Sequence, residues 1–140
     1  MRVGAPLPAR ILIVDDHVLT RTAIRSFLES HSFHVCGEAE DGKEAIEQVV
    51  DLKPDLVLLD ISMPVMNGIK SAVEIRRVAP ATKIVFLTNH DIPIIVDATR
   101  TLAEGFVRKS AAVAELIPTL NRVVGISPDG SIKSRRAATD

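Results

Sequence analysis

The stretch DLVLLDISMPVMNG, at residues 55–68, decides the fold expected of this chain. An unbroken apolar run ends at Asp60, and Pro64 and Gly68 then break any regular structure. A continuous apolar run of this length is typical of a strand covered on both faces of a parallel sheet. The stretch therefore predicts a buried strand over residues 55–59 that ends on an acidic side chain.

Four further runs flank this strand in the sequence. They cover residues 10–14 (RILIV), 33–37, 83–87 (KIVFL) and, more weakly, 105–107. Each is short enough for a strand and is rich in β-branched or aromatic residues. We therefore expect five strands.

The segments between these runs show the spacing of amphipathic helices. Helices are expected over residues 18–28, 41–52, 67–78, 92–103 and 111–124. Asp41 and Glu44 form a capping-box-like start, and Pro118 is expected to kink the last helix or to delay its start. Alternating strands and helices predict an α/β fold, a doubly wound five-stranded parallel sheet with five helices on both faces.

Composition restricts the organisation and the partners of the chain. Its 140 residues suit one domain, expected over residues 10–124, between a flexible N-terminus (1–9) and a linker or frayed tail (125–140). A formal net charge of −1 gives no reason to expect nucleic acid or a membrane as the main partner. A single cysteine, Cys36, and the lack of an apolar leader favour the cytoplasm.

Five polar residues follow the expected strands: Asp15, Asp16, Asp60, Thr88 and Lys109. The carboxyl ends of parallel strands form the ligand-binding edge of such a sheet. Clustered carboxylates favour a hard divalent cation, Mg²⁺ (or Mn²⁺), and cations on both sides allow a carboxylate to act as a nucleophile toward phosphorus. Asp60, which ends the central run, is the best candidate for that nucleophile.

Each of these residues also has an ordinary structural explanation. An Asp after a strand is commonly a helix cap or a turn residue, as Asp16 would be if considered alone. A lone Thr at a strand end is usually a β-branched strand residue, and a lone Lys is usually solvated. The functional interpretation depends on all five residues lying at strand ends together.

The chain resembles the receiver domain of two-component response regulators over nearly its whole length. The matching stretches are ILIVDDH (11–17), DLVLLDISMPVMNG (55–68), IVFLTNH (84–90) and GFVRKS (105–110). The resemblance implies a flavodoxin-like fold with strand order 2-1-3-4-5. It also implies a phosphorelay protein that accepts a phosphoryl group from a sensor histidine kinase.

The resemblance also assigns roles to residues. It implies Asp60 as the phosphoacceptor, and as metal ligands Asp16, Asp15 through water, Asp60 and the backbone carbonyl of Ser62. Thr88 and Lys109 would bind phosphoryl oxygens. The family's switch pair would be Thr88 and Phe106, although a plain core Phe explains Phe106 almost as well. Ser62 and His90 would modulate hydrolysis, and an exposed loop His is an equal alternative for His90.

The DDH and TNH stretches look most like the NarL/LuxR-type subfamily, whose members usually carry a DNA-binding output domain and act as dimers. Residues 125–140 leave no room for such a domain, so we expect a truncated regulator or a stand-alone receiver acting through protein contacts. DNA contact would then need the missing domain, a homodimer is compatible with the pattern, and no membrane partner is expected. Asn89 and the segment TLAEGFV (101–107) depart from the common family pattern.

Three rival functions can be weighed on the same residues. A haloacid-dehalogenase-like phosphatase needs a second acid two residues after its nucleophile, where this chain has Ser62. A flavin or nucleotide binder needs a Gly-rich phosphate loop, where this chain has Asp15 and Asp16. A degenerate receiver used only for binding would not need all five polar residues. We therefore predict a signalling phosphoacceptor that modifies only itself, rather than an enzyme with outside substrates.

Overall fold

Five parallel strands form one sheet in the order β2-β1-β3-β4-β5 in the computed structural model, which describes residues 7–89 and 100–125. The strands are β1 (Arg10–Val14), β2 (His34–Ala39), β3 (Leu56–Leu59), β4 (Lys83–Thr88) and β5 (Gly105–Arg108). The helices are α1 (Val18–Glu29), α2 (Gly42–Leu52), α3 (Gly68–Val78) and α5 (Ala112–Val124), with a 3₁₀ turn over Lys109–Ala111. The predicted doubly wound parallel sheet and its strand order are confirmed.

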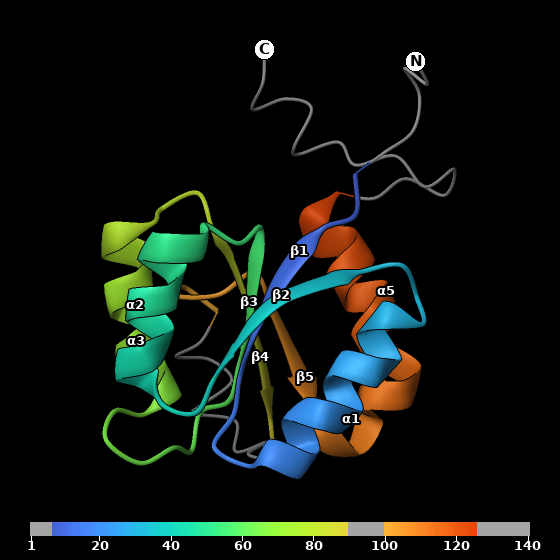
Figure 1. The fold of residues 1–140 in the computed structure, drawn as a ribbon, viewed down its shortest axis with the longest axis horizontal. Coiled ribbons are helices and arrows are strands. Elements are labelled where there is room, and N and C mark those ends of the chain that lie inside the picture. Colours follow the sequence, from blue (N-terminus) through green and yellow to red (C-terminus); the bar gives the residue numbers. More distant parts are fainter. Residues whose placement is uncertain (1–6, 90–99, 126–140) are drawn as a thin grey trace.

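Helices cover both faces of the sheet, so the protein has two apolar cores (Figure 1). Odd-numbered residues of β1, Ile11 and Ile13, point into the core beneath α1 and α5. Even-numbered residues, Leu12 and Val14, point into the core beneath α2 and α3. Because side chains alternate across a strand, burial on both faces requires the unbroken apolar runs seen in the sequence.

Several predicted boundaries shift by one or two residues, and one predicted helix is not seen among the described residues. Strand β2 begins at His34 and continues to Ala39, beyond the predicted 33–37. The helix expected over residues 92–103 falls mostly outside the described residues, and residues 100–102 form a turn instead. The described part of the chain therefore contains four α-helices rather than five.

Pro118 lies inside α5, which begins at Ala112, so the expected delay in the helix start does not occur. Proline removes one backbone hydrogen bond from a helix interior. The apolar face of α5 offsets this loss, because Leu116, Leu120, Val123 and Val124 are buried against the sheet. No helix in the described part of the chain has both the length and the apolar character needed to cross a membrane.

Helices α2 and α3 begin where side chains cap their first turns. The Asp41 side chain accepts a hydrogen bond from the Glu44 backbone N–H, and the Glu44 side chain accepts one from the Glu40 N–H. This is close to the predicted capping box, except that Glu44 accepts from the N–H of Glu40 rather than from that of the N-cap residue Asp41. At α3, the Asn67 side chain accepts from the Lys70 N–H. These caps fix where the chain turns after β2 and after the loop that follows Asp60.

The loop between β3 and α3 contains a residue in an unfavourable backbone conformation. Val65 has a φ of 70°, and the Met66 N–H donates to the Pro64 carbonyl at 2.7 Å, which closes a three-residue turn around Val65. A β-branched side chain is strained in this region of φ, where glycine is not. The Val65 side chain is exposed, so few packing contacts compensate for the strain.

We predict that Val65→Gly stabilises the protein. Relief of a left-handed conformation is worth about 1–2 kcal/mol, less the extra freedom that glycine gives the unfolded chain, so a net gain on the order of 0.5–1 kcal/mol is expected. Urea unfolding followed by circular dichroism measures this difference. A control, Val73→Gly in the middle of α3, should destabilise, and an unstable Val65→Gly variant would contradict the prediction.

Candidate functional site

The carboxyl edge of the sheet brings together four of the predicted polar residues. Val14 pairs with Leu59, and the Asp60 N–H donates to the Val14 carbonyl, so Asp15 and Asp60 follow neighbouring strands at the same level. Thr88 ends β4, and Lys109 follows β5 directly. Asp15, Asp60 and Thr88 are 2%, 5% and 0% exposed. The sheet register thus collects two buried carboxyl groups, a buried hydroxyl and an ammonium group.

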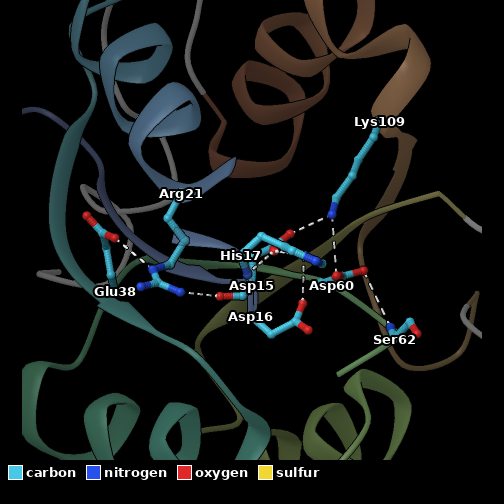
Figure 2. Close-up of polar contacts among 8 residues, drawn as sticks. All are labelled: Asp15, Asp16, His17, Arg21, Glu38, Asp60, Ser62 and Lys109. Carbon is cyan, nitrogen blue, oxygen red and sulfur yellow. Dashed lines mark hydrogen bonds and ion pairs between the residues drawn. The ribbon is translucent and has the colours of Figure 1, made fainter. Parts of the chain in front are cut away.

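Lys109 joins the two buried carboxylates. Its Nζ lies 2.6 Å from Asp15 Oδ2 and 3.4 Å from Asp60 Oδ2 (Figure 2). The shorter distance is that of a strong charge-assisted hydrogen bond, and the longer one is near the limit for any hydrogen bond. Lys109 is therefore held mainly by Asp15, and its charge remains close to Asp60.

The two partners of this contact have shifted pKa values with different causes. Burial raises the pKa of Asp60, and the nearby Asp15 charge adds to it, while Lys109 and a hydrogen bond from Thr88 compensate only in part. Burial alone would lower the pKa of Lys109, but the hydrogen bond to Asp15 and the charge of Asp60 outweigh it, so the pKa rises. Asp60 is thus a desolvated carboxyl group beside a firmly charged ammonium group.

Asp16 and His17 complete the acidic end of β1. One possible ligand atom each from Asp15, Asp16 and His17 all lie within 4.8 Å of one another. Asp16 Oδ1 is buried without a hydrogen-bond partner, although His17 Nδ1 lies 3.1 Å away. A buried carboxylate oxygen without a partner is costly unless it binds a cation. The carboxylate oxygens of Asp15 and Asp16 fit a hard divalent ion such as Mg²⁺.

The loop after Asp60 is packed tightly against the site. Gly68 N–H donates to the Ile61 carbonyl at 2.8 Å, and a methyl group on Gly68 would overlap the carbonyl oxygen of Asp60. Only glycine allows the start of α3 to approach the main chain of Asp60 this closely. The Ser62 N–H faces Asp60 Oδ1 at 3.4 Å. The glycine in DLVLLDISMPVMNG thus helps to place Asp60.

The other predicted site residues lie at different distances from this cluster. The Ser62 side chain is exposed at the site, and its carbonyl is the predicted metal ligand. Phe106 is half-buried on β5, where it pairs in register with Phe86 and packs against the core beneath α2 and α3. His90 lies outside the described residues. Asp60 is not in the close group formed by Asp15, Asp16 and His17 among the residues that were described.

Two residues that contact the acidic pair were given no role from the sequence, His17 and Arg21, and Glu38 in turn binds Arg21. His17 was visible in the DDH stretch, and its N–H donates to Asp15 Oδ1 at 2.9 Å. Arg21 and Glu38 carry no local signal, because one lies on α1 and the other on β2. Only the folded chain brings Arg21 to the Asp15 carbonyl and Glu38 to Arg21.

Known proteins resemble this chain over most of its length. A family model described as the response regulator receiver domain matches residues 11–121. The chemotaxis protein CheY of Thermotoga maritima is 35% identical over 115 residues, which are 81% of this chain and 96% of that protein.

Two solved structures have the same fold. A LuxR-family two-component response regulator from Aurantimonas is 30% identical, with a TM-score of 0.79 over 94% of each chain. A CheX–CheY–BeF₃–Mg²⁺ complex from Borrelia burgdorferi is 27% identical, with a TM-score of 0.80 over 84% of this chain and 90% of that one. Four other curated relatives are longer, and the chain spans only 41% to 58% of their length.

We predict that Asp60→Asn stabilises the protein at neutral pH. Because the pKa of Asp60 is raised above its ordinary value of 3.8, the folded chain binds this proton more tightly than the unfolded chain. The free energy of unfolding therefore falls as the pH rises from the ordinary pKa through the raised one. Removing the charge should add on the order of 1 kcal/mol at pH 7, and the gain should shrink as the pH falls through the raised pKa toward 3.8.

Urea unfolding at pH 7 and pH 4, followed by circular dichroism, measures this gain. The raised pKa of Lys109 does not interfere, because its contribution is present throughout this range and is lost only at alkaline pH. Asp51→Asn, at an exposed position of α2, controls for the loss of one negative charge. A wild-type chain more stable than Asp60→Asn at pH 7 would show that the prediction is wrong.

Proposed function

This chain belongs to the response regulator receiver family, and from that premise we propose that Asp60 accepts a phosphoryl group from a histidine kinase. One observation carries the proposal. The buried Asp60 carboxylate lies 3.4 Å from the Lys109 ammonium, beside the acidic pair Asp15 and Asp16, which fits a divalent cation. A carboxylate with positive charge on both sides can receive a phosphoryl group and hold it as an acyl phosphate.

The cation proposed for this site is Mg²⁺, or Mn²⁺ in its place. Asp15, Asp16 and Asp60 would hold it, with the Ser62 carbonyl, and the solved CheX–CheY complex with BeF₃ and Mg²⁺ supports this choice of metal for a relative. When bound, such an ion neutralises phosphoryl oxygens. The buried Asp16 Oδ1 without a hydrogen-bond partner supports the assignment in this chain.

The proposed transfer is an in-line displacement. An oxygen of the Asp60 carboxylate bonds to phosphorus as the P–N bond of the donor phosphohistidine breaks, and its electron pair leaves with the imidazole, which takes up a proton. The Lys109 ammonium faces the oxygens of the transferred group, and the Thr88 hydroxyl moves from Asp60 to one of them. Ser62 carries no acid that could protonate another leaving group, so the site favours self-modification over turnover of outside substrates.

Phosphorylation would report to partners through Thr88 and Phe106. Thr88 hydrogen-bonds Asp60 before transfer, so a new bond to the phosphoryl group would pull the end of β4. Phe106 lies half-buried on the neighbouring strand β5, and its proposed change is from this position to a more buried one. This pair would couple the site to the β5–α5 surface. Ser62 and His90 are proposed to affect how long the phosphoryl group survives.

The downstream effect of phosphorylation is proposed from the proteins that this chain resembles. Similarity to a LuxR-family regulator, and relatives much longer than this chain, support a cytoplasmic transcriptional regulator that contacts DNA through a separate output domain. The match to nearly all of a CheY protein supports the alternative, a receiver that acts through protein contacts alone. Homodimer formation on phosphorylation belongs to the first alternative.

We expect acetyl phosphate with Mg²⁺ to add one phosphoryl group to the wild-type chain, as seen by intact-protein mass spectrometry. Asp60→Asn should abolish the adduct, because a neutral carboxamide cannot act as the nucleophile toward phosphorus. Lys109→Met should reduce its formation by roughly 10²-fold, since the charge that faces the developing negative oxygens is lost.

Asp51→Asn is the matched control and should be phosphorylated like the wild type. An adduct of equal yield on Asp60→Asn would contradict the proposal. So would turnover of p-nitrophenyl phosphate well above background, because it would indicate a phosphatase.

A further inference from the structure

Arg21 on α1 contacts the acidic pair from behind, on the side away from Lys109 (Figure 2). Its Nη1 donates to the main-chain carbonyl of Asp15 at 2.6 Å, and its Nε donates to Glu38 Oε1 at 2.9 Å. The side chain is 13% exposed. A planar guanidinium group has donors in a fixed fork, so one arginine can hold both acceptors at once.

Both polar groups of the Asp15 main chain are held by these contacts. Its N–H donates to the Ala39 carbonyl at the end of β2, at 3.0 Å. Its carbonyl accepts from Arg21, which is itself tied to Glu38 on the same strand. Because a peptide unit is planar, a fixed Asp15 carbonyl also fixes the N–H of Asp16 and the position of the Asp16 Cα, from which its side chain extends.

Glu38 keeps this arrangement anchored. Burial raises the pKa of Glu38, but the hydrogen bonds from Arg25 and Arg21 outweigh burial, so the pKa lies below its ordinary value. The Glu38 carboxylate is therefore charged at neutral pH, and its two oxygens bind one arginine each. Arg25 contacts Glu38 at 2.7 Å and Glu29 at 3.5 Å, and among the described residues it does not bind Asp15.

We propose that Arg21 is a positioning residue for the divalent cation, because it holds the peptide between Asp15 and Asp16 in the orientation that presents both carboxylates. This inference rests on the proposed function, since it assumes a cation at the acidic pair. Residues behind metal ligands commonly change metal affinity 10- to 100-fold when they are removed. We expect Arg21→Met to weaken Mn²⁺ binding about tenfold.

The direction of the change in Mn²⁺ affinity distinguishes a positioning role of Arg21 from an effect of its charge alone. A guanidinium group near a cation site repels the cation, so loss of its charge alone would tighten binding. Positioning requires the opposite result, because the acidic pair loses its fixed orientation. Arg25→Met supplies the matched control: it removes the same charge from the same helix and one ion pair with Glu38, but leaves the Asp15 carbonyl bound.

The experiment measures free Mn²⁺ by electron paramagnetic resonance during titration of the full chain. Wild type, Arg21→Met and Arg25→Met are compared, with thermal unfolding to show that both variants are folded. The rate of phosphorylation by acetyl phosphate is then measured at saturating Mn²⁺. We expect weaker binding only in Arg21→Met, and a rate that returns to near the wild-type value at saturation.

Each other result overturns the inference. Equal or tighter binding in Arg21→Met would assign Arg21 to charge or folding alone, and equal weakening in Arg25→Met would assign the effect to the ion pairs with Glu38. A rate that saturating Mn²⁺ does not restore would indicate general distortion of the site. If the wild-type chain bound no Mn²⁺, the cation site of the proposed function would itself be wrong, a failure that is seen before any variant is compared.

Discussion

A single ammonium group, that of Lys109, balances two buried carboxylates at the carboxyl edge of the sheet, and the site depends on this contact. Asp15 Oδ2 lies 2.6 Å from the ammonium nitrogen, whereas Asp60 Oδ2 lies 3.4 Å from it and is compensated less well by its charge. Burial therefore raises the pKa of Asp60 above its ordinary value even beside a cation. An imperfectly compensated carboxylate of this kind is stabilised by any added positive charge, which suits a residue proposed to act with a metal and to carry a phosphoryl group.

The fold supplies rigid support for this contact from two directions. On one side, the start of α3 packs directly on the main chain of Asp60 through Gly68. On the other, α1 and β2 hold the main chain of Asp15 through Arg21 and Ala39. The central strands lie between two apolar cores and have little freedom to adjust, so the strand ends are held in place. The proposed chemistry thus takes place at the ends of strands that are packed on both faces.

The strands, two helix starts and the location of the site were predictable from local sequence. The apolar runs indicated every strand within two residues, and the polar residues directly after them indicated the edge where a site would form. The capping residues Asp41 and Asn67 marked two helix starts. Prediction was poorer where long-range packing competes with local preference. Pro118 is tolerated inside α5 because the helix buries one whole face, and the arginine and glutamate behind Asp15 have no local pattern at all.

By itself, the sequence determined the class of fold and the set of residues at the strand ends. Both follow from the spacing of apolar residues, because strands covered on two faces need continuous apolar runs. Only the tertiary structure decided which of these residues touch. Lys109 and Asp15 are 94 positions apart, and their contact depends on strand order and register. The same holds for Arg21 and Glu38, whose role behind the acidic pair exists only once α1 packs beside β2, because a hydrogen bond depends on distance in space and not along the chain.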